Sequence, residues 1–535
     1  KELIMKKAAA LLALVLGISC ASTDSGSLSS GSNATIALMG GRVFTADPSR
    51  PWAEAVAIQG DRIMAVGSVE EVRSWVDEST RIVPLEGRVV IPGINDAHVH
   101  APWPTVPAAR LEIPDQATLG QMLAMVREAA AHEPAGTWII GSFPLGLLDG
   151  GITRADIDEV ALDHPVQLDV LGGHASLLNT PALRLWGVEE NVVDPPGGWY
   201  GRKEGRLDGW LYEHAFWAPQ VRFANGMTNA ELEDAIRNFE SEALRYGITS
   251  VQTMSPVSAT RVEYILSLRP STLRWRVIDF RMAPFDPSPG SLPVKYILDG
   301  TPIERGGAMR QPYADAPGHR GRMNYSLEEI DAMVRDAAPG GRQLLVHVAG
   351  DAAAAAVLAA MQKYDDGSWP KRRVRLEHAT GLSNDLLPEA RRLGVVVVEN
   401  PSHFMLPGVM AARFGPQRSM QFGRARTFYD GNIPFALGSD GPLNPFLNMM
   451  FVARHPGNPN ETLSVEQALL AYTRGSAYAE FQANMKGAIA PGMLADLAVL
   501  SQDIFAVPLD QLPQTSSVMT IVGGKVVWEG MGAGD

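Results

Sequence analysis

The chain has 535 residues, of which 46% are hydrophobic and 20% charged, so it is long enough for a large core or for more than one domain. Its formal net charge of -13 argues against nucleic acid as a partner, because an acidic protein gains no affinity from releasing the counterions of nucleic-acid phosphates. Cys20 is the only cysteine, so an internal disulfide and a thiolate metal cluster are excluded, and nitrogen and oxygen must supply any metal ligands.

The first residues have the pattern of an export signal. Two lysines precede an apolar segment over 8–18 that is too short to cross a bilayer comfortably, so we predict a signal peptide over 1–19. The Ser- and Gly-rich stretch over 20–33 predicts a flexible tether. Cys20 stands where a bacterial lipoprotein carries its lipid, so we expect lipid anchoring in the cell envelope or periplasm. Simple signal cleavage is the alternative, and we expect membrane contact only through this anchor.

Both ends of the mature chain have the sequence pattern of short β-strands separated by turns, which is typical of a small β-domain. Short strand patterns separated by Gly, Asp and Pro fill residues 34–92. Similar patterns return over 486–532, where two strands flank the tight turn Gly523-Gly524. Because neither end can bury a sheet face well by itself, we predict one small β-sandwich built from both termini.

Between these ends, residues 93–485 alternate apolar strands with helical stretches, which is the pattern of repeated βα units. Strands are expected near 91–99, 247–253, 274–281, 293–299, 343–349, 374–379, 394–399 and 433–439. This number of strands predicts an α/β fold, a closed (β/α)8 TIM barrel, with an open doubly wound sheet as the alternative. The long gap after the first strand predicts an inserted lid subdomain at about 101–240.

Side chains that suit metal binding stand on these strands, mostly at the carboxyl ends, where barrel enzymes have their active sites. His98 and His100 alternate on the first strand, so both side chains lie on one face. The other candidates are Lys295 on the fourth strand, His347 on the fifth, His378 on the sixth and Asp440 after the eighth.

Lys295 is unusual, because an unpaired ammonium group buried in an apolar strand is costly. Carbamylation by CO2 would convert the amine into a carboxylate that can bridge two cations. Snorkelling to the barrel rim is the alternative.

Four imidazoles, one carboxylate and one carbamate would suit two adjacent divalent ions. These ligands favour Zn2+, while manganese, iron, cobalt and nickel remain open. Such ions lower the pKa of bound water and polarise a carbonyl group. Asp440 is the candidate catalytic residue, because it could collect the proton of the water and pass it to the leaving group. A purely ligating role for Asp440 is the alternative.

Five motifs occur in an order that resembles the amidohydrolase superfamily, and within it the YtcJ-like or amidohydrolase-3 branch, which includes N-substituted formamide deformylase-like enzymes. They are Pro92-Gly93-Ile94-Asn95-Asp96-Ala97-His98-Val99-His100, Val294-Lys295, His347-Val348-Ala349-Gly350-Asp351, Arg375-Leu376-Glu377-His378-Ala379 and Gly438-Ser439-Asp440-Gly441-Pro442. The resemblance implies a metal-dependent hydrolase of C–N, less often C–O, bonds. It implies that one metal is held by His98, His100 and Asp440, the other by His347 and His378, and that Lys295 bridges them.

Two further histidines are candidates for substrate contact. His174 lies in the insert, in a segment that is similar to a motif of this branch, and His403 follows the seventh strand. Both are expected near the barrel mouth, and a structural role is the alternative for each.

We therefore predict a metal-dependent amidohydrolase that cleaves an amide-like C–N bond of a small-molecule substrate by metal-activated hydroxide. An esterase or lactonase, a deaminase or an isomerase on the same site remain alternatives, as does a non-catalytic envelope protein that binds a ligand. Whether the chain forms a homo-oligomer is left open.

Overall fold

The computed structural model describes residues 33–103, 106–338 and 341–530. The predicted signal peptide, Cys20 and the tether up to residue 32 lie outside the described residues. Within the described ranges, no helix has both the length and the apolarity needed to span a membrane.

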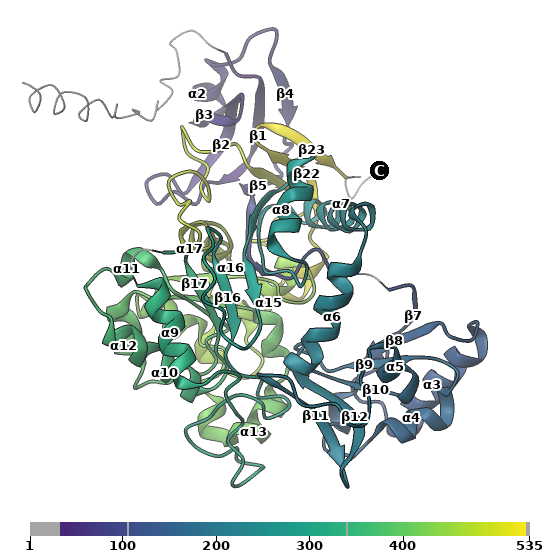
Figure 1. The fold of residues 1–535 in the computed structure, drawn as a ribbon. Coiled ribbons are helices and arrows are strands. Elements are labelled where there is room, and N and C mark those ends of the chain that lie inside the picture. The colour runs from purple at the N-terminus through teal and green to yellow at the C-terminus, as the bar shows by residue number, and fades with distance from the viewer. Residues whose placement is uncertain (1–32, 104–105, 339–340, 531–535) are drawn as a thin grey trace, which may run out of the picture.

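Both ends of the described chain form one eight-stranded sheet, which lies at the top of Figure 1 in purple and yellow. Its strands are β1 (Ile36–Phe44), β2 (Trp52–Gln59), β3 (Arg62–Gly67), β4 (Arg81–Pro84), β5 (Val89–Pro92), β21 (Leu497–Leu500), β22 (Ser517–Val522) and β23 (Lys525–Glu529). The order is β23-β22-β21-β5-β1-β2-β3, and β4 pairs with β1. β21 runs antiparallel to β5, so residues from the two ends share one sheet. The second layer of a sandwich stays a prediction.

The terminal sheet is held by apolar side chains that alternate along its strands. Leu38, Val56 and Ile58 from the N-terminal strands pack in one cluster with Leu497 and Ile521 from the C-terminal strands. Short helix α2 (Val69–Arg73) begins with a capping box at Ser68 and packs on the other side of β2 and β3.

The central part of the chain forms two parallel ladders. One is a three-stranded sheet and the other is six-stranded. Their strands are β6 (Ile94–Val99), β13 (Ile248–Thr253) and β14 (Arg274–Val277), then β15 (Asp279–Arg281), β16 (Val294–Ile297), β17 (Leu344–His347), β18 (Arg375–Glu377), β19 (Val396–Glu399) and β20 (Phe435–Leu437). Because all pairs are parallel, the carboxyl ends of neighbouring strands lie on the same side.

The chain itself connects the two ladders at one pair of free edges, and a hydrogen bond connects them at the other. Only Ile278 separates β14 from β15, and its N–H donates to the Thr253 carbonyl over 2.8 Å. Beyond the end of β20, the Asp440 N–H donates to the His98 carbonyl on β6 over 3.0 Å. No β-ladder joins β20 to β6 among the described strands, so a closed barrel stays a prediction.

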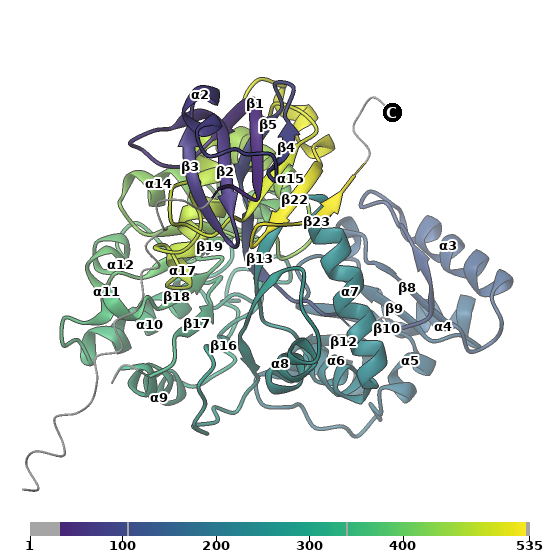
Figure 2. The same cartoon turned by 90° about the horizontal axis from the view of Figure 1, so that it is seen from above.

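Helices follow most of these strands and cover them on the outside (Figure 2). They include α7 (Asn229–Arg245), α8 (Ala259–Ser267), α9 (Leu327–Ala337), α10 (Asp351–Lys363), α11 (Trp369–Arg372), α12 (Leu387–Leu393), α13 (Pro407–Ser419), α14 (Ala425–Asp430) and α15 (Pro445–Arg454). In α9 the buried residues Ile330, Met333, Val334 and Ala337 recur at helical spacing, so one stripe faces the core.

The last helical stretch is interrupted. The sequence predicts one helix over 465–481, whereas the chain forms α16 (Val465–Leu470), a π-helical turn over Ala471–Gly475 and α17 (Ser476–Ala479). The Thr473 hydroxyl donates to the Leu469 carbonyl and the Ser476 hydroxyl to the Ala471 carbonyl, so side chains compete for backbone acceptors here.

Between β6 and α6 (His214–Gly226) lies a separate six-stranded sheet, seen at the lower right of Figure 1. Its strands are β7 (Ala108–Leu111), β8 (Trp138–Ser142), β9 (Val166–Asp169), β10 (Ala175–Leu178), β11 (Gly198–Lys203) and β12 (Arg206–Glu213). Helices α3 (Leu119–His132), α4 (Arg154–Ala161) and α5 (Thr180–Leu185) accompany it. Met122, Val126 and Ile139 are fully buried in a cluster within this segment.

An ion pair fixes the terminal sheet to the central strands, and it provides a test. Asp496 accepts two hydrogen bonds from the Arg274 guanidinium, at 2.7 and 3.0 Å, and its side chain is buried. Asp496→Asn should lower the free energy of unfolding by about 2 kcal/mol, because it leaves a half-buried guanidinium without its charge partner.

Glu529→Gln is the matched control, because the Arg81–Glu529 pair in the same sheet is exposed on both sides. We expect a loss of at most about 0.5 kcal/mol there, measured by chemical denaturation. Equal losses in the two variants would show that the Arg274–Asp496 pair does not fasten the sheet.

Candidate metal centre

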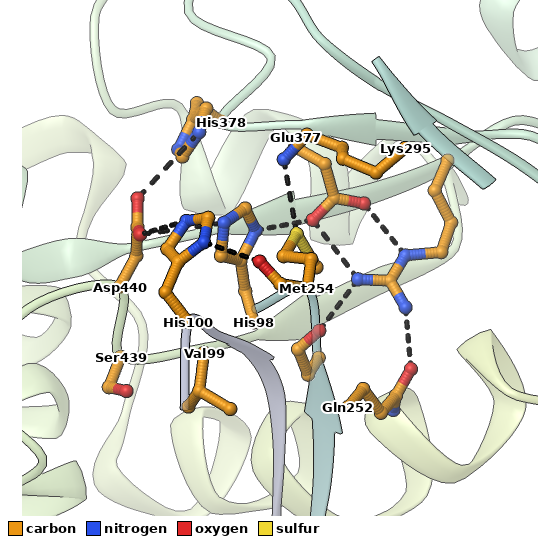
Figure 3. Close-up of polar contacts among 12 residues, drawn as sticks. His98, Val99, His100, Gln252, Met254, Lys295, Glu377, His378, Ser439 and Asp440 are labelled. Carbon is orange, nitrogen blue, oxygen red and sulfur yellow. Dashed lines mark hydrogen bonds and ion pairs between the residues drawn. The ribbon is translucent and has the colours of Figure 1, made fainter. Parts of the chain in front are cut away.

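Imidazole and carboxylate groups from several strand ends meet in one cavity of about 1210 Å³. Its wall includes the predicted residues His100, His174, Lys295, His347, His378, His403 and Asp440. Figure 3 shows His98, His100 and His378 turned toward the Asp440 carboxylate.

Asp440 is the centre of the cluster. Its Oδ1 lies 3.1 Å from His100 Nε2 and 3.5 Å from His98 Nε2, and its Oδ2 lies 3.7 Å from His378 Nε2. Ligand atoms of His98, His378 and Asp440 all lie within 4.8 Å of one another. The structure therefore brings together ligand atoms from a residue on β6 and from residues that follow β18 and β20.

The close approach of β20 to β6 explains how Asp440 reaches the histidines. The Asp96 carboxylate accepts hydrogen bonds from the Ser439 N–H at 2.9 Å and the His98 N–H at 3.1 Å, so it ties the two segments together. A Cβ at Gly438 would stand 2.5 Å from the His98 backbone nitrogen, so a side chain there would force the segments apart. Asp440 itself has φ +41°, an uncommon backbone state for a residue other than glycine.

His347 and His378 form a second pair, with ring centroids 4.6 Å apart. His347 Nε2 is buried without a hydrogen-bond partner and lies 3.9 Å from Asp299 Oδ1. Asp299 in turn accepts backbone N–H groups of Ala308, Ala349 and Gly350 at 2.7 to 3.0 Å, which holds the segment that follows His347.

Lys295 is almost fully buried on β16, and its Nζ lies 3.2 Å from Met254 Sδ. Burial lowers the pKa of Lys295 to about 8, although the carboxylates of Glu377 and Asp440 oppose this shift. Burial therefore favours the neutral amine, which is the form that reacts with CO2.

Glu377, which lies in the motif Arg375-Leu376-Glu377-His378-Ala379, is a further functional candidate whose role the sequence did not predict. Its Oε2 accepts a hydrogen bond from His98 Nδ1 at 2.5 Å, and its Oε1 lies 2.8 Å from Arg375 Nε (Figure 3). Burial alone would raise the pKa of Glu377, but the neighbouring Arg375 and His98 lower it to about 2. The sequence signal for this role is the alternation of Arg375 and Glu377, which places both side chains on one face of a strand.

These partners fix which ring nitrogen each histidine presents. Because Glu377 accepts from Nδ1 of His98, Nε2 is left for the cavity, where it is buried without a partner. His100 Nδ1 lies 2.8 Å from the Met254 carbonyl, so its Nε2 is likewise turned to Asp440. Burial lowers the pKa of His98 to about 4, so this ring is neutral, as a metal ligand must be.

The two predicted substrate-contacting histidines lie at the same cluster. His174 comes from the inserted segment, and its ring centroid is 4.6 Å from that of His347. Burial opposes a charge on His174, but the Glu213 carboxylate at 3.0 Å from Nδ1 raises its pKa overall. His403 Nε2 lies 3.7 Å from Asp440 Oδ2. Contact of either residue with substrate stays a prediction.

The arrangement fits a divalent cation. Buried polar atoms are normally satisfied, yet Nε2 of His98 and Nε2 of His347 have no partner among the described atoms. A cation coordinated by imidazole nitrogens and the Asp440 carboxylate would satisfy them with ligand types that zinc and related metals accept.

Comparison with known proteins places these residues in a wider group. A model of the family described as "Amidohydrolase family" (Amidohydro_3) matches residues 81–528. Putative amidohydrolase YtcJ of Bacillus subtilis is 27% identical, and the match covers 92% of this chain and 98% of that protein. N-substituted formamide deformylase of Arthrobacter pascens is 26% identical, with 93% and 98% covered.

A similar solved structure supports the fold. The crystal structure of an uncharacterized metal-dependent hydrolase from Pyrococcus horikoshii matches with a TM-score of 0.67 and 19% identity, and covers 89% of this chain and 99% of that one. At this identity, the likeness shows an α/β fold shared with that hydrolase and no more.

The carboxylate behind His98 gives a test of the candidate metal centre. In Glu377→Gln we expect the affinity for Zn2+ to fall by about 10- to 100-fold, because the ring of His98 loses the charged acceptor that orients it. The loss of charge also leaves Arg375 unpaired in the core and should destabilise the fold.

Glu399→Gln on the neighbouring strand β19 is the matched control. Burial raises the pKa of Glu399 well above its ordinary value, so its charged form is disfavoured and an amide of the same shape is a mild replacement. Zinc affinity is measured by competition with a chelator on variants that keep the native circular dichroism spectrum. A folded Glu377→Gln variant with unchanged affinity would contradict the orienting role.

Proposed function

Because the chain belongs to the amidohydrolase family, we propose that it is a metal-dependent hydrolase that cleaves an amide-like C–N bond of a small molecule. The resemblance to the YtcJ-like branch, predicted from the motifs, is confirmed by full-length relatives. The observation that carries the proposal is the convergence of three imidazoles on the Asp440 carboxylate inside a large cavity.

In this proposal His98, His100 and Asp440 would hold one cation and His347 and His378 a second, and a carbamate on Lys295 would supply a further carboxylate ligand for them. The nitrogen and oxygen ligands favour Zn2+. The cations would supply acidified water and a polarised substrate carbonyl at neutral pH.

Asp440 has the proton-transfer role. Burial alone would raise its pKa, but His98, His100 and His378 around it hold the pKa of Asp440 well below the ordinary range. The carboxylate is therefore ionised at neutral pH and can accept a proton from the attacking water. It then delivers this proton to the nitrogen of the leaving amine, so the C–N bond breaks without releasing an anionic nitrogen.

The cavity wall indicates where the substrate lies. Trp103, Leu171 and Met405 line the cavity and are exposed, so they offer an apolar rim to the hydrocarbon part of a substrate. His174 and His403 line the same cavity, where they would donate hydrogen bonds to polar groups of the substrate. The relative named N-substituted formamide deformylase supports an amide as the reactive group.

The remaining sequence-based interpretations belong to the same proposal. The central strands form a (β/α)8 barrel that is completed where β20 meets β6, and the segment with its own sheet covers the mouth as a lid. The N-terminal pattern supports export and lipid attachment at Cys20.

Asp440→Asn tests the proposed chemistry. The amide keeps the shape of the side chain but cannot accept a proton, so we expect turnover to fall by about 10³-fold or more with the thermal midpoint nearly unchanged. Amine release is followed on a panel of N-alkyl and N-aryl amides, with esters included to reveal another bond preference.

Asp510→Asn, an exposed change far along the chain, is the control and should leave turnover unaltered. Undiminished amide hydrolysis in Asp440→Asn would remove this residue from the mechanism. If only the esters in the panel react, the bond that the protein cleaves is an ester C–O bond and not the proposed C–N bond.

Carbamylation of Lys295 is tested by metal loading. Metal-free protein is incubated with Zn2+ at pH 8, with and without bicarbonate, and metal content and intact mass are measured. We expect bicarbonate to raise the metal content and to add the mass of CO2, because the free amine of Lys295 is then available. Lys295→Gln should not respond, whereas full loading without bicarbonate would contradict the carbamate ligand.

A further inference from the structure

A second cavity, of about 490 Å³, lies at the amino ends of the central strands. Pro293 directly precedes β16, Leu344 begins β17 and Val374 directly precedes β18, and all three residues line it. The same strands lead toward the candidate metal centre at their carboxyl ends. Because the strands are parallel, this cavity opens at the opposite end of the sheet.

The wall of this amino-end cavity is strongly basic. Four cationic side chains line it, namely Arg276, Arg342, Lys371 and Arg372. Its other lining residues are neutral, so no carboxylate stands in the wall. This concentration of positive charge occurs in a chain with a formal net charge of -13, so it is not a reflection of overall composition.

Arg342 shows that the wall has unused donors. Its side chain is only 4% exposed, and its Nη2 donates to the Ser288 carbonyl at 3.0 Å. Its Nη1 is buried and has no hydrogen-bond partner in the described structure, and the Asp279 carboxylate lies 3.9 Å away. The Asp336 carboxylate lies 3.5 Å from Nη2, so Arg342 has charge partners, but neither carboxylate accepts a hydrogen bond from Nη1. A buried guanidinium donor without an acceptor is costly, so the position favours an additional hydrogen-bond acceptor.

Neighbouring cationic side chains in the wall also have hydrogen-bond donors or charges without a partner among the described residues. Arg372 Nη2 pairs with Asp366 at 2.9 Å, but its Nη1 is buried without a partner. Lys371 is exposed and has no ion pair among the described residues. Arg276 donates to Gln343 at 2.6 Å, and burial together with the nearby Arg375 lowers its pKa to about 10, although the carboxylates of Glu480 and Glu377 oppose this shift.

We propose that the amino-end cavity binds a small molecule through a phosphate group. Guanidinium groups donate pairs of hydrogen bonds to phosphate oxygens, and a lysine adds a point charge. Phe481 lines the same cavity and is 40% exposed, and the Arg373 guanidinium lies 4.5 Å from its ring centroid, so an aromatic group would pack on the part of the ring that remains exposed. A phosphate ester of an aromatic base would use both features, whereas free phosphate would use only the charges.

Calorimetric titration of the metal-loaded full chain, at constant ionic strength, tests the proposal. Inorganic phosphate and adenosine monophosphate are the two probes. We expect saturable binding with one site per chain, weakened about tenfold in Lys371→Gln and in Arg342→Gln, since each variant removes a charge-assisted hydrogen bond. Lys203→Gln, an exposed lysine on β11, is the matched control and should bind as the wild type does.

Two further variants separate the sources of a binding signal. Phe481→Ala should weaken adenosine monophosphate alone if a base lies on the ring, and equal binding of both probes to this variant and the wild type would identify free phosphate as the ligand. In Asp440→Asn the affinity should persist, because the amino-end cavity is not the metal centre.

The proposal is overturned if no saturable binding occurs. It is also overturned if binding is lost in Asp440→Asn and unchanged in Lys371→Gln, because phosphate would then bind the metal centre. Since Lys371 is exposed, its variant remains informative even where Arg342→Gln does not fold.

Discussion

The fully buried ion pair between Arg375 and Glu377 is the interaction on which the candidate centre depends. One Glu377 oxygen is held by Arg375 Nε and the other by His98 Nδ1, so a carboxylate on β18 fixes a ring on β6. Arg375 also donates to the Gln252 side chain at 2.5 Å and the Ala97 carbonyl at 2.6 Å. Every charge in this network is compensated, which is what allows it to remain buried.

The backbone brings Asp440 to the histidines, which the side-chain network around Arg375 and Glu377 does not do. Parallel pairing places the carboxyl ends of β16 to β20 side by side, while Asp96 and Gly438 let β20 meet β6 where no ladder connects them. Asp440 is therefore held by the junction of the first and last central strands. A separate cavity lies at the amino ends of the same strands, and none of the candidate metal ligands lines it. Its wall includes Arg276, Arg342 and Arg372.

Local patterns predicted much of this arrangement. The alternation of His98 and His100 and the positions of His347 and His378 near strand ends follow from strand periodicity, and the structure brings all four toward Asp440. Partners distant in the chain were not predictable in this way. The contact from Glu377 to His98 spans 279 positions, and the pairing of β21 with β5 depends on the whole intervening fold. The π-helical turn was missed because hydroxyl back-bonding leaves no mark on apolar spacing.

The central claim is that His98 and Asp440 hold a cation in the cavity. The most direct measurement is anomalous X-ray diffraction from crystals of the zinc-loaded protein. The account predicts an anomalous peak about 2.0–2.1 Å from His98 Nε2, with Asp440 as a further ligand. Zinc bound only at other sites, with His98 Nε2 and Asp440 uncoordinated at full occupancy, would contradict it.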